Sequence, residues 1–183
     1  MISRRGFLRT GIAGTCAFCT GYTPFVTAVN ASGMDEEEFP AIEAMYYKKL
    51  PDIRVECELC PRACQVADLE RGYCGVRENR DGKYYTLVHS RVCSLNADPI
   101  EKKPLFHYLP GTRAYSIATA GCNIECKFCQ NWQISQFRPE QIDNIKLTPE
   151  EVVRFAKEKS CDTIAYTYSE PVVFYEYMYD TAR

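Results

Sequence analysis

The sequence has little excess charge of either sign, no long apolar run and no low-complexity tract. Lysine and arginine number 22 against 24 aspartate and glutamate, so the polybasic surface of a nucleic-acid-binding protein is absent. The short apolar stretches exclude a protein with several membrane spans. With 46% hydrophobic and 13% aromatic residues, the composition also excludes an intrinsically disordered chain.

Cysteine, in contrast, is abundant: 11 of the 183 residues, most of them in close clusters. A disulfide scaffold is one interpretation, because small secreted proteins are often stabilised in this way. Such scaffolds are usually short and poor in core, whereas this chain is long enough to bury a core. The clusters at residues 57–64 and 122–129 therefore favour shared metal ions over pairwise bridges.

The first 31 residues are predicted to be a targeting segment. Residues 1–10 contain three arginines and no acid, and SRRGFL at residues 3–8 resembles a twin-arginine export signal, with a cleavage site after Ala31. Pro24 and several glycines argue against a membrane-spanning helix. We therefore expect export to the periplasm, with a cytoplasmic location as the alternative, and a mature part with about five net negative charges, which disfavours nucleic-acid binding.

Residues 32–110 are predicted to form a small cysteine-rich α+β domain. Acidic residues at the start of the segment, Pro40 and a lysine pair near its end predict a helix over residues 35–50. Residues 75–78 and 83–88 are predicted to form a hairpin around the Asp-Gly turn. Residues 98–111, with three prolines, are predicted to be a connector.

Residues 111–183 are predicted to be α/β. Strands at residues 113–119 and 163–168 flank a helix that starts at the capping box of residues 148–151 and ends near Lys159, and Pro171 starts another helix. This order indicates right-handed βαβ units around a parallel sheet. Because two parallel strands cannot close a barrel, and the last helix has no glycine or asparagine cap, we expect the chain to be the amino-terminal part of a longer protein.

The second cysteine cluster, Cys122, Cys126 and Cys129, directly follows the first of these strands. Active sites of parallel α/β folds lie at the carboxyl ends of strands. Three thiolates can bind three irons of a 4Fe-4S cluster and leave the fourth iron open. A structural zinc completed by His107 or Cys93 is the alternative.

The pattern Cys-x3-Cys-x-aromatic-Cys, with Phe128 as the aromatic member, resembles the radical S-adenosylmethionine (SAM) enzymes. The resemblance implies a partial (β/α) barrel and a 4Fe-4S cluster whose open iron binds SAM. It further implies reductive cleavage of SAM to a 5′-deoxyadenosyl radical, which abstracts hydrogen from a substrate. In this interpretation Phe128 packs near the adenine of SAM and Trp132 belongs to the core.

A wider set of motifs, at residues 57–62, 94–107 and 129–132, is similar to the radical enzyme of the AmmeMemoRadiSam system, a relative of pyruvate formate-lyase activating enzymes. The resemblance covers about residues 40–183. It implies an electron donor and Memo-like and AMMECR-like proteins as partners, and it leaves a glycyl-radical-enzyme activase as an alternative function. The substrate does not follow from it.

Glu170 is a further candidate. The family has a Gly-Gly-Glu motif after its second strand that contacts the amino group of SAM, and residues 168–171 here read Tyr-Ser-Glu-Pro, which keeps the glutamate and loses both glycines. The resemblance implies that Glu170 contacts SAM. The alternative is an ordinary helix cap before Pro171.

The first cluster, Cys57, Cys60, Cys64 and Cys74, offers four thiolates for a structural zinc or a second iron-sulfur cluster, and the spacing does not decide between them. Cys93 is interpreted as a core thiol or a substitute ligand and Cys161 as a core residue. His89 is placed in a strand over residues 84–92. A non-catalytic module in which both clusters are structural or relay electrons is the second functional class.

Overall fold

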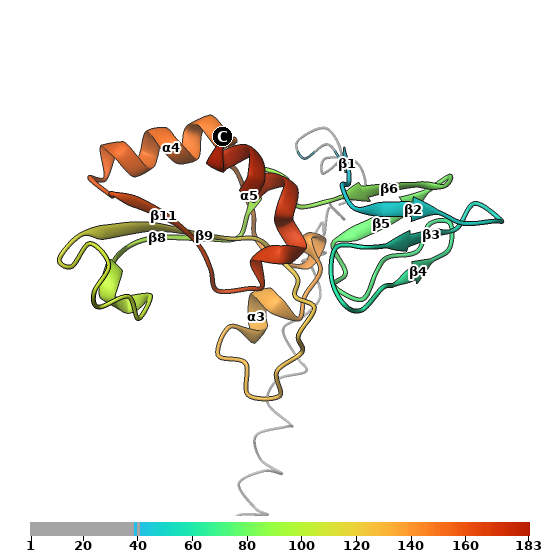
Figure 1. Ribbon diagram of the computed structural model, residues 1–183, viewed down its shortest axis with the longest axis horizontal. Helices are drawn as coiled ribbons and strands as arrows, with labels where there is room; N and C mark the ends of the chain where they lie inside the picture. Colours follow the sequence, from blue (N-terminus) through green and yellow to red (C-terminus); the bar gives the residue numbers. More distant parts are fainter. Residues whose placement is uncertain (1–38, 40) are drawn as a thin grey trace, which may run out of the picture. The chain divides into compact units, whose positions relative to one another are not determined.

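The computed structural model describes Phe39 and residues 41–183, and residues 41–183 belong to one compact unit (Figure 1). The predicted targeting segment, residues 1–31, lies outside the described residues. Two separate hydrophobic clusters form the core, a small one under the cysteine-rich strands and a larger one under the α/β part. The predicted division into domains at residues 110 and 111 stays a prediction.

The cysteine-rich part contains two three-stranded antiparallel sheets, with the orders β2-β3-β4 and β1-β6-β5. Their strands are β1 (Ile42–Glu43), β2 (Tyr47–Lys49), β3 (Val55–Cys57), β4 (Gln65–Val66), β5 (Arg77–Arg80) and β6 (Lys83–Thr86).

The helix predicted over residues 35–50 is wrong for the described residues, because β1 and β2 occupy this stretch. Tyr46 has a φ of 55°, which a right-handed helix does not allow. Tyr47 pairs with Cys57 of β3, and Ile42 pairs with Thr86 of β6. Pairing with β3 and β6 thus determines the conformation of these residues, and the helix-like spacing of their side chains does not.

The predicted hairpin is confirmed. β5 and β6 pair antiparallel, with Arg80 opposite Lys83, and the turn consists of Asp81 and Gly82, both with positive φ. The Asn79 side-chain oxygen accepts a hydrogen bond from the Gly82 amide at 3.0 Å, which closes the turn.

The remaining elements alternate short strands with helical turns. They are β7 (Arg91–Val92), β8 (Ser94–Pro99), η1 (Ile100–Lys102), β9 (Arg113–Ala118), α3 (Trp132–Ser135), η2 (Pro139–Gln141), β10 (Ile145–Lys146), α4 (Pro149–Glu158), β11 (Thr163–Tyr166), η3 (Pro171–Phe174) and α5 (Tyr175–Ala182).

The main sheet has the order β11-β9-β8. The predicted parallel pair is confirmed, with Ile117 of β9 opposite Tyr166 of β11. The sheet also has an antiparallel edge strand, β8, whose last residues fall within the predicted connector at 98–111. The placement of His89 in a strand is wrong: it lies in the turn between β6 and β7, where the chain changes from one sheet to another.

Helices α4 and α5 cover one face of this sheet (Figure 1). The predicted capping box starts α4: Thr148 Oγ1 accepts from the Glu151 amide at 3.3 Å, and Glu151 Oε2 accepts from the Thr148 amide at 2.9 Å. Pro171 opens the 3-10 turn η3, and α5 begins only at Tyr175, later than predicted. Tyr177 of α5 is fully buried in the larger core cluster.

Candidate functional site

An irregular loop of residues 119–131, here called the cysteine loop, connects the carboxyl end of β9 to α3 (Figure 1). Gly121 opens it with a φ of 87°, and its amide donates to the Ile134 carbonyl at 2.9 Å. A Cβ at this position would lie 2.5 Å from Val76 Cγ1 and 2.6 Å from the Cys74 carbonyl oxygen. Only glycine allows the loop to pass this close to the cysteine-rich part.

The three predicted cluster ligands lie in this loop. Cys126 is exposed, and Cys122 and Cys129 are partly buried. The Cys129 amide donates to the Cys126 carbonyl at 3.1 Å, which forms a turn, and Cys129 Sγ lies 3.2 Å from Ser135 Oγ. Among Phe39 and residues 41–183, no three or more His, Cys, Asp or Glu side chains are arranged so that they could hold a metal ion. Their role as ligands therefore stays a prediction.

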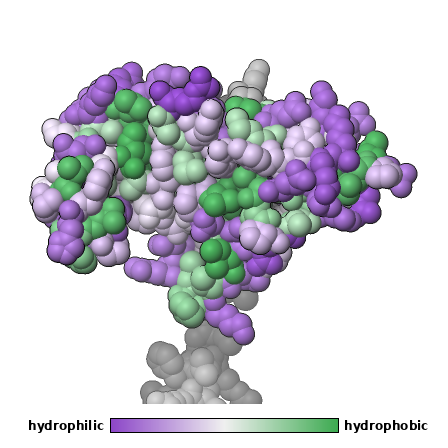
Figure 2. Space-filling model, viewed as in Figure 1, coloured by the Kyte–Doolittle hydropathy of each residue, from purple (hydrophilic) through white to green (hydrophobic). Residues whose placement is uncertain are grey.

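Large apolar side chains on and beside the cysteine loop point into solvent. The exposed fraction is 91% for Phe128, 54% for Ile124 and 52% for Trp132. The assignment of Trp132 to the core is therefore wrong; its ring instead packs against that of Phe137, with the centroids 5.9 Å apart. Hydrophobic residues also show at the surface of the projection that holds the loop and α3 (Figure 2). Such exposed apolar groups are typical of a surface that contacts a ligand or a partner.

The loop is tied to the carboxyl end of β11. Asn131 Nδ2 donates to the Tyr168 carbonyl at 3.0 Å. Two residues later, Glu170 Oε1 accepts from the Val172 amide at 3.4 Å, which is the capping contact considered from the sequence. Ser169 Oγ donates to the Thr119 carbonyl at 2.8 Å. The segment with Glu170 and the cysteine loop thus start from the same edge of the sheet.

A cavity of about 1010 Å³ lies between the cysteine loop and the main sheet. Leu95 and Ala97 of β8 pack on the helix-covered core, so Ser94 and Asn96 belong to the opposite face, where they line the cavity. Gln130 and Asn131 line it from the cysteine loop. Its volume is at the upper end for a small-molecule site.

Asp98 organises one wall of this cavity. Its carboxylate accepts from Lys102 Nζ at 2.9 Å, from Lys103 Nζ at 2.8 Å and from the Tyr168 hydroxyl at 2.6 Å. Burial alone would raise the pKa of Asp98, but the hydrogen bonds from Lys103, Tyr168 and Lys102 outweigh it and hold the pKa well below its ordinary range. The sequence analysis assigned no role to Asp98; two lysines four and five residues after an acid were the available signal.

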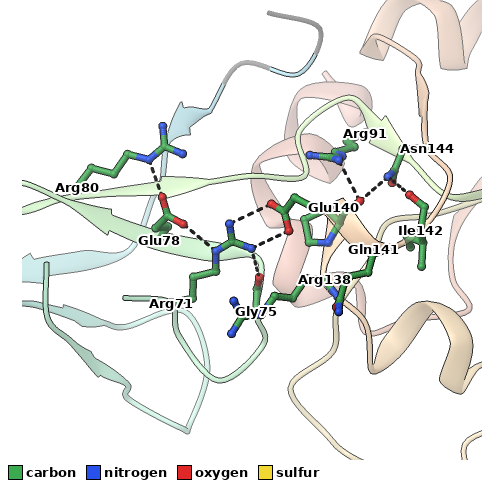
Figure 3. Close-up of polar contacts among 11 residues, drawn as sticks. Arg71, Gly75, Glu78, Arg80, Arg91, Arg138, Glu140, Gln141, Ile142 and Asn144 are labelled. Carbon is green, nitrogen blue, oxygen red and sulfur yellow. Dashed lines mark hydrogen bonds and ion pairs between the residues drawn. The ribbon is translucent and has the colours of Figure 1, made fainter. Parts of the chain in front are cut away.

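A polar network holds the segment after α3 against the cysteine-rich part (Figure 3). Arg71 donates to both carboxylate oxygens of Glu140, at 2.9 and 3.0 Å, and its Nε donates to Glu78 at 2.7 Å. Arg91 Nη2 donates to the Pro139 carbonyl at 2.9 Å. Through Arg71, this bidentate pair ties Glu140 of η2 to Glu78 of β5.

The other predicted site residues lie apart from the loop. Cys57, Cys60, Cys64 and Cys74 line a small cavity in the cysteine-rich part. Cys93 Sγ donates to the Ala118 carbonyl at 3.5 Å, and burial raises the pKa of this thiol to about 11. Cys161 is partly buried against the larger core cluster. His107 lies exposed in the loop after η1.

Comparison with known proteins gives a family match for the last part of the chain. Residues 116–183 match the model of the Radical SAM superfamily. The uncharacterized protein MJ0808 of Methanocaldococcus jannaschii is 53% identical over 140 residues, which are 76% of this chain and 42% of that protein. The uncharacterized protein MJ0674 of the same organism is 30% identical over 139 residues, 69% of this chain and 36% of that protein. The chain thus spans less than half the length of these two relatives.

No solved structure matches the chain. Within the part of the chain that the structure describes, there is also no helix with the length and apolar character needed to cross a membrane.

Proposed function

We propose that this chain, whose residues 116–183 match the Radical SAM superfamily, binds a 4Fe-4S cluster on Cys122, Cys126 and Cys129 and cleaves SAM reductively. The observation that supports this most strongly is the position of the cysteine loop: it lies within the matched segment and directly follows the carboxyl end of a strand in a parallel pair.

The side chains of the loop fit a thiolate-bound iron cluster. Three cysteines on an irregular, accessible loop can converge on iron without disturbing a helix or strand, and Gly121 and Asn131 tie the two ends of the loop to the rest of the fold. When bound, the cluster would supply one electron, from an external low-potential donor, to break a carbon–sulfur bond of the SAM sulfonium, giving methionine and a 5′-deoxyadenosyl radical.

The neighbouring residues would bind and orient SAM. The exposed ring of Phe128 would pack on the adenine, and Glu170 would accept a hydrogen bond from the amino group. The apolar side chains of Ile124 and Trp132 would exclude water from the bound cofactor. The cavity beside Asn131 would receive the substrate.

The experiment is anaerobic reconstitution of the full-length protein with iron and sulfide, followed by measurement of 5′-deoxyadenosine after addition of dithionite and SAM. We expect formation of 5′-deoxyadenosine by the wild type, none by Cys126→Ala, and wild-type amounts from the matched control Cys161→Ala. A wild-type protein that binds zinc alone and no iron would exclude this function.

We extend the proposal to the biological setting suggested by the sequence motifs. The enzyme would act with Memo-like and AMMECR-like partners, and the resemblance to pyruvate formate-lyase activating enzymes makes hydrogen abstraction from a protein glycine the second reaction to test. Co-purification with these partners, and an electron paramagnetic resonance search for a glycyl radical, distinguish the two.

Export by the twin-arginine pathway is likewise a proposal, supported by the SRRGFL pattern at residues 3–8. Cell fractionation with detection of the mature form tests it. Retention of the uncleaved protein in the cytosol would contradict it.

A further inference from the structure

The four cysteines of the first cluster surround one small cavity in the cysteine-rich part. They come from the end of β3, from the loop that follows it and from the loop before β5: Cys57, Cys60, Cys64 and Cys74. The cavity has a volume of about 20 Å³. Since a water molecule needs roughly 10 to 15 Å³, this cavity accommodates one atom-sized occupant.

A backbone amide already points at one of these sulfurs. The Tyr73 amide donates to Cys64 Sγ at 3.5 Å. Amide donors of this kind stabilise negative charge on sulfur, because a thiolate is a better acceptor than a thiol.

The same cavity is lined by buried donors that have no acceptor. Arg77 and Tyr84 are 1% and 0% exposed. Arg77 Nε, Arg77 Nη1 and the Tyr84 hydroxyl have no hydrogen-bond partner. A buried donor without an acceptor costs about 1 to 3 kcal/mol, so such groups call for an explanation. Anionic sulfur in the cavity would provide the missing acceptors.

We propose that Cys57, Cys60, Cys64 and Cys74 bind a single zinc ion as a tetrathiolate site, separate from the catalytic cluster. Four thiolates around a divalent ion carry two net negative charges, and the unpaired Nε and Nη1 donors of Arg77, which lines the same cavity, would donate to these thiolates. None of the three cysteines of the cysteine loop lines this cavity.

The size of the cavity decides between the two metal groups that the spacing left open. A zinc ion with Zn–S distances of about 2.3 Å is itself a single atom, so the four cysteines that line the cavity would close around it. The metal-free thiols are not yet arranged as a ligand set, so binding draws them together. A four-iron cluster would have to displace the buried Tyr84 ring and the buried Arg77 side chain that line the cavity.

A zinc ion at this site would also stabilise the cysteine-rich part. Its sheets share a core cluster of only five buried residues: Ala44, Val55, Cys57, Val66 and Tyr84. Small cores of this kind usually need a metal or another crosslink, and structural zinc supplies folding free energy directly. The zinc would hold β3 and the start of β5 together, and through Gly121 it would support the floor of the cysteine loop.

The test uses the full-length protein in which Cys122, Cys126 and Cys129 are replaced by alanine, so that iron bound at the loop is removed. Purified anaerobically, it should retain one equivalent of zinc, and cobalt(II) added to the metal-free form should give the intense visible bands of tetrahedral thiolate coordination. In the same background, Cys60→Ser and Cys64→Ser should lower zinc content at least roughly tenfold, and Cys161→Ser should leave it unchanged.

A second measurement does not depend on any variant folding. Alkylation of the wild-type thiols, read by mass spectrometry, should leave the four cysteines protected until zinc is removed by a chelator. Equal alkylation with and without the chelator would overturn the proposal. Iron with acid-labile sulfide in the triple variant, or full zinc content in Cys60→Ser together with Cys64→Ser, would do so as well.

Discussion

Gly121 passes so close to Val76 that a Cβ on the glycine would lie 2.5 Å from Val76 Cγ1. Gly121→Ala should therefore lower the free energy of unfolding by about 2 to 4 kcal/mol, through positive-φ strain and overpacking together. It should also displace the cysteine loop and reduce iron content after reconstitution. Denaturant unfolding and iron analysis measure the two effects.

Gly111→Ala is the matched control for this substitution. Gly111 also has a positive φ, of 78°, but no atom lies within 4 Å of a Cβ built there. Gly111→Ala should lower the free energy of unfolding only by the backbone strain, about 1 kcal/mol, and should leave the iron content unchanged. Equal losses in the two variants would show that the approach to Val76 has no role.

The buried ion pair between Arg77 and Glu176 joins β5 to α5. Arg77 Nη2 lies 2.6 Å from Glu176 Oε1, and the two side chains are 1% and 3% exposed. Glu176→Gln leaves the guanidinium buried without its counter-charge, so we expect a loss of about 3 kcal/mol in the free energy of unfolding. The exposed pair of Arg154 and Glu158 is the comparison: Arg154→Ala should cost less than about 1 kcal/mol.

Asp98 predicts how stability depends on pH. Its folded pKa is depressed, because the hydrogen bonds from Lys103, Tyr168 and Lys102 outweigh the effect of burial. The resulting stabilisation is fully present above the unfolded pKa of 3.8 and is lost as the pH falls below that value toward the folded pKa.

Asp98→Asn removes this dependence. Unfolding free energies measured between pH 7 and pH 3 should fall more steeply for the wild type than for Asp98→Asn, and the two curves should converge in acid. The cysteines are the same in both proteins, so protonation of metal ligands cancels in the comparison. Parallel curves would contradict the assignment.

Glu170→Gln separates the two interpretations of that residue. Glutamine keeps an oxygen that can accept from the Val172 amide, so the cap should survive and stability should change by less than about 0.5 kcal/mol. Loss of the carboxylate charge should weaken SAM binding roughly tenfold or more, measured by equilibrium dialysis, if Glu170 contacts the amino group. Glu158→Gln, at an exposed position on α4, is the control. If Glu170→Gln leaves the SAM affinity unchanged, Glu170 acts only as a helix cap.

Local signals in the sequence predicted the elements that depend on nearby residues. The capping box at Thr148 and Glu151, the Asp81–Gly82 turn and the parallel strands at residues 113–118 and 163–166 all follow from short patterns whose partners lie within a few residues or share a buried character. Cys122, Cys126 and Cys129 likewise stand within eight residues of sequence, inside the segment that matches the family model.

The errors arose where distant partners decide the structure. Residues 42–49 resemble a helix in their spacing, but they pair with strands that follow up to about 45 residues later, such as Thr86 opposite Ile42. Trp132, predicted to belong to the core, is half exposed and packs against Phe137 instead. The Asp98–Tyr168 hydrogen bond spans 70 residues and has no local signature.

The separation of Arg77 and Glu176 by 99 residues has a consequence for synthesis on the ribosome. Arg77 emerges long before Glu176, and its guanidinium has to remain hydrated until α5 exists. During this interval the cysteine-rich part cannot dehydrate its core completely. Docking of α5 then supplies the buried counter-charge, so this part completes its core only after the last helix described here has been made.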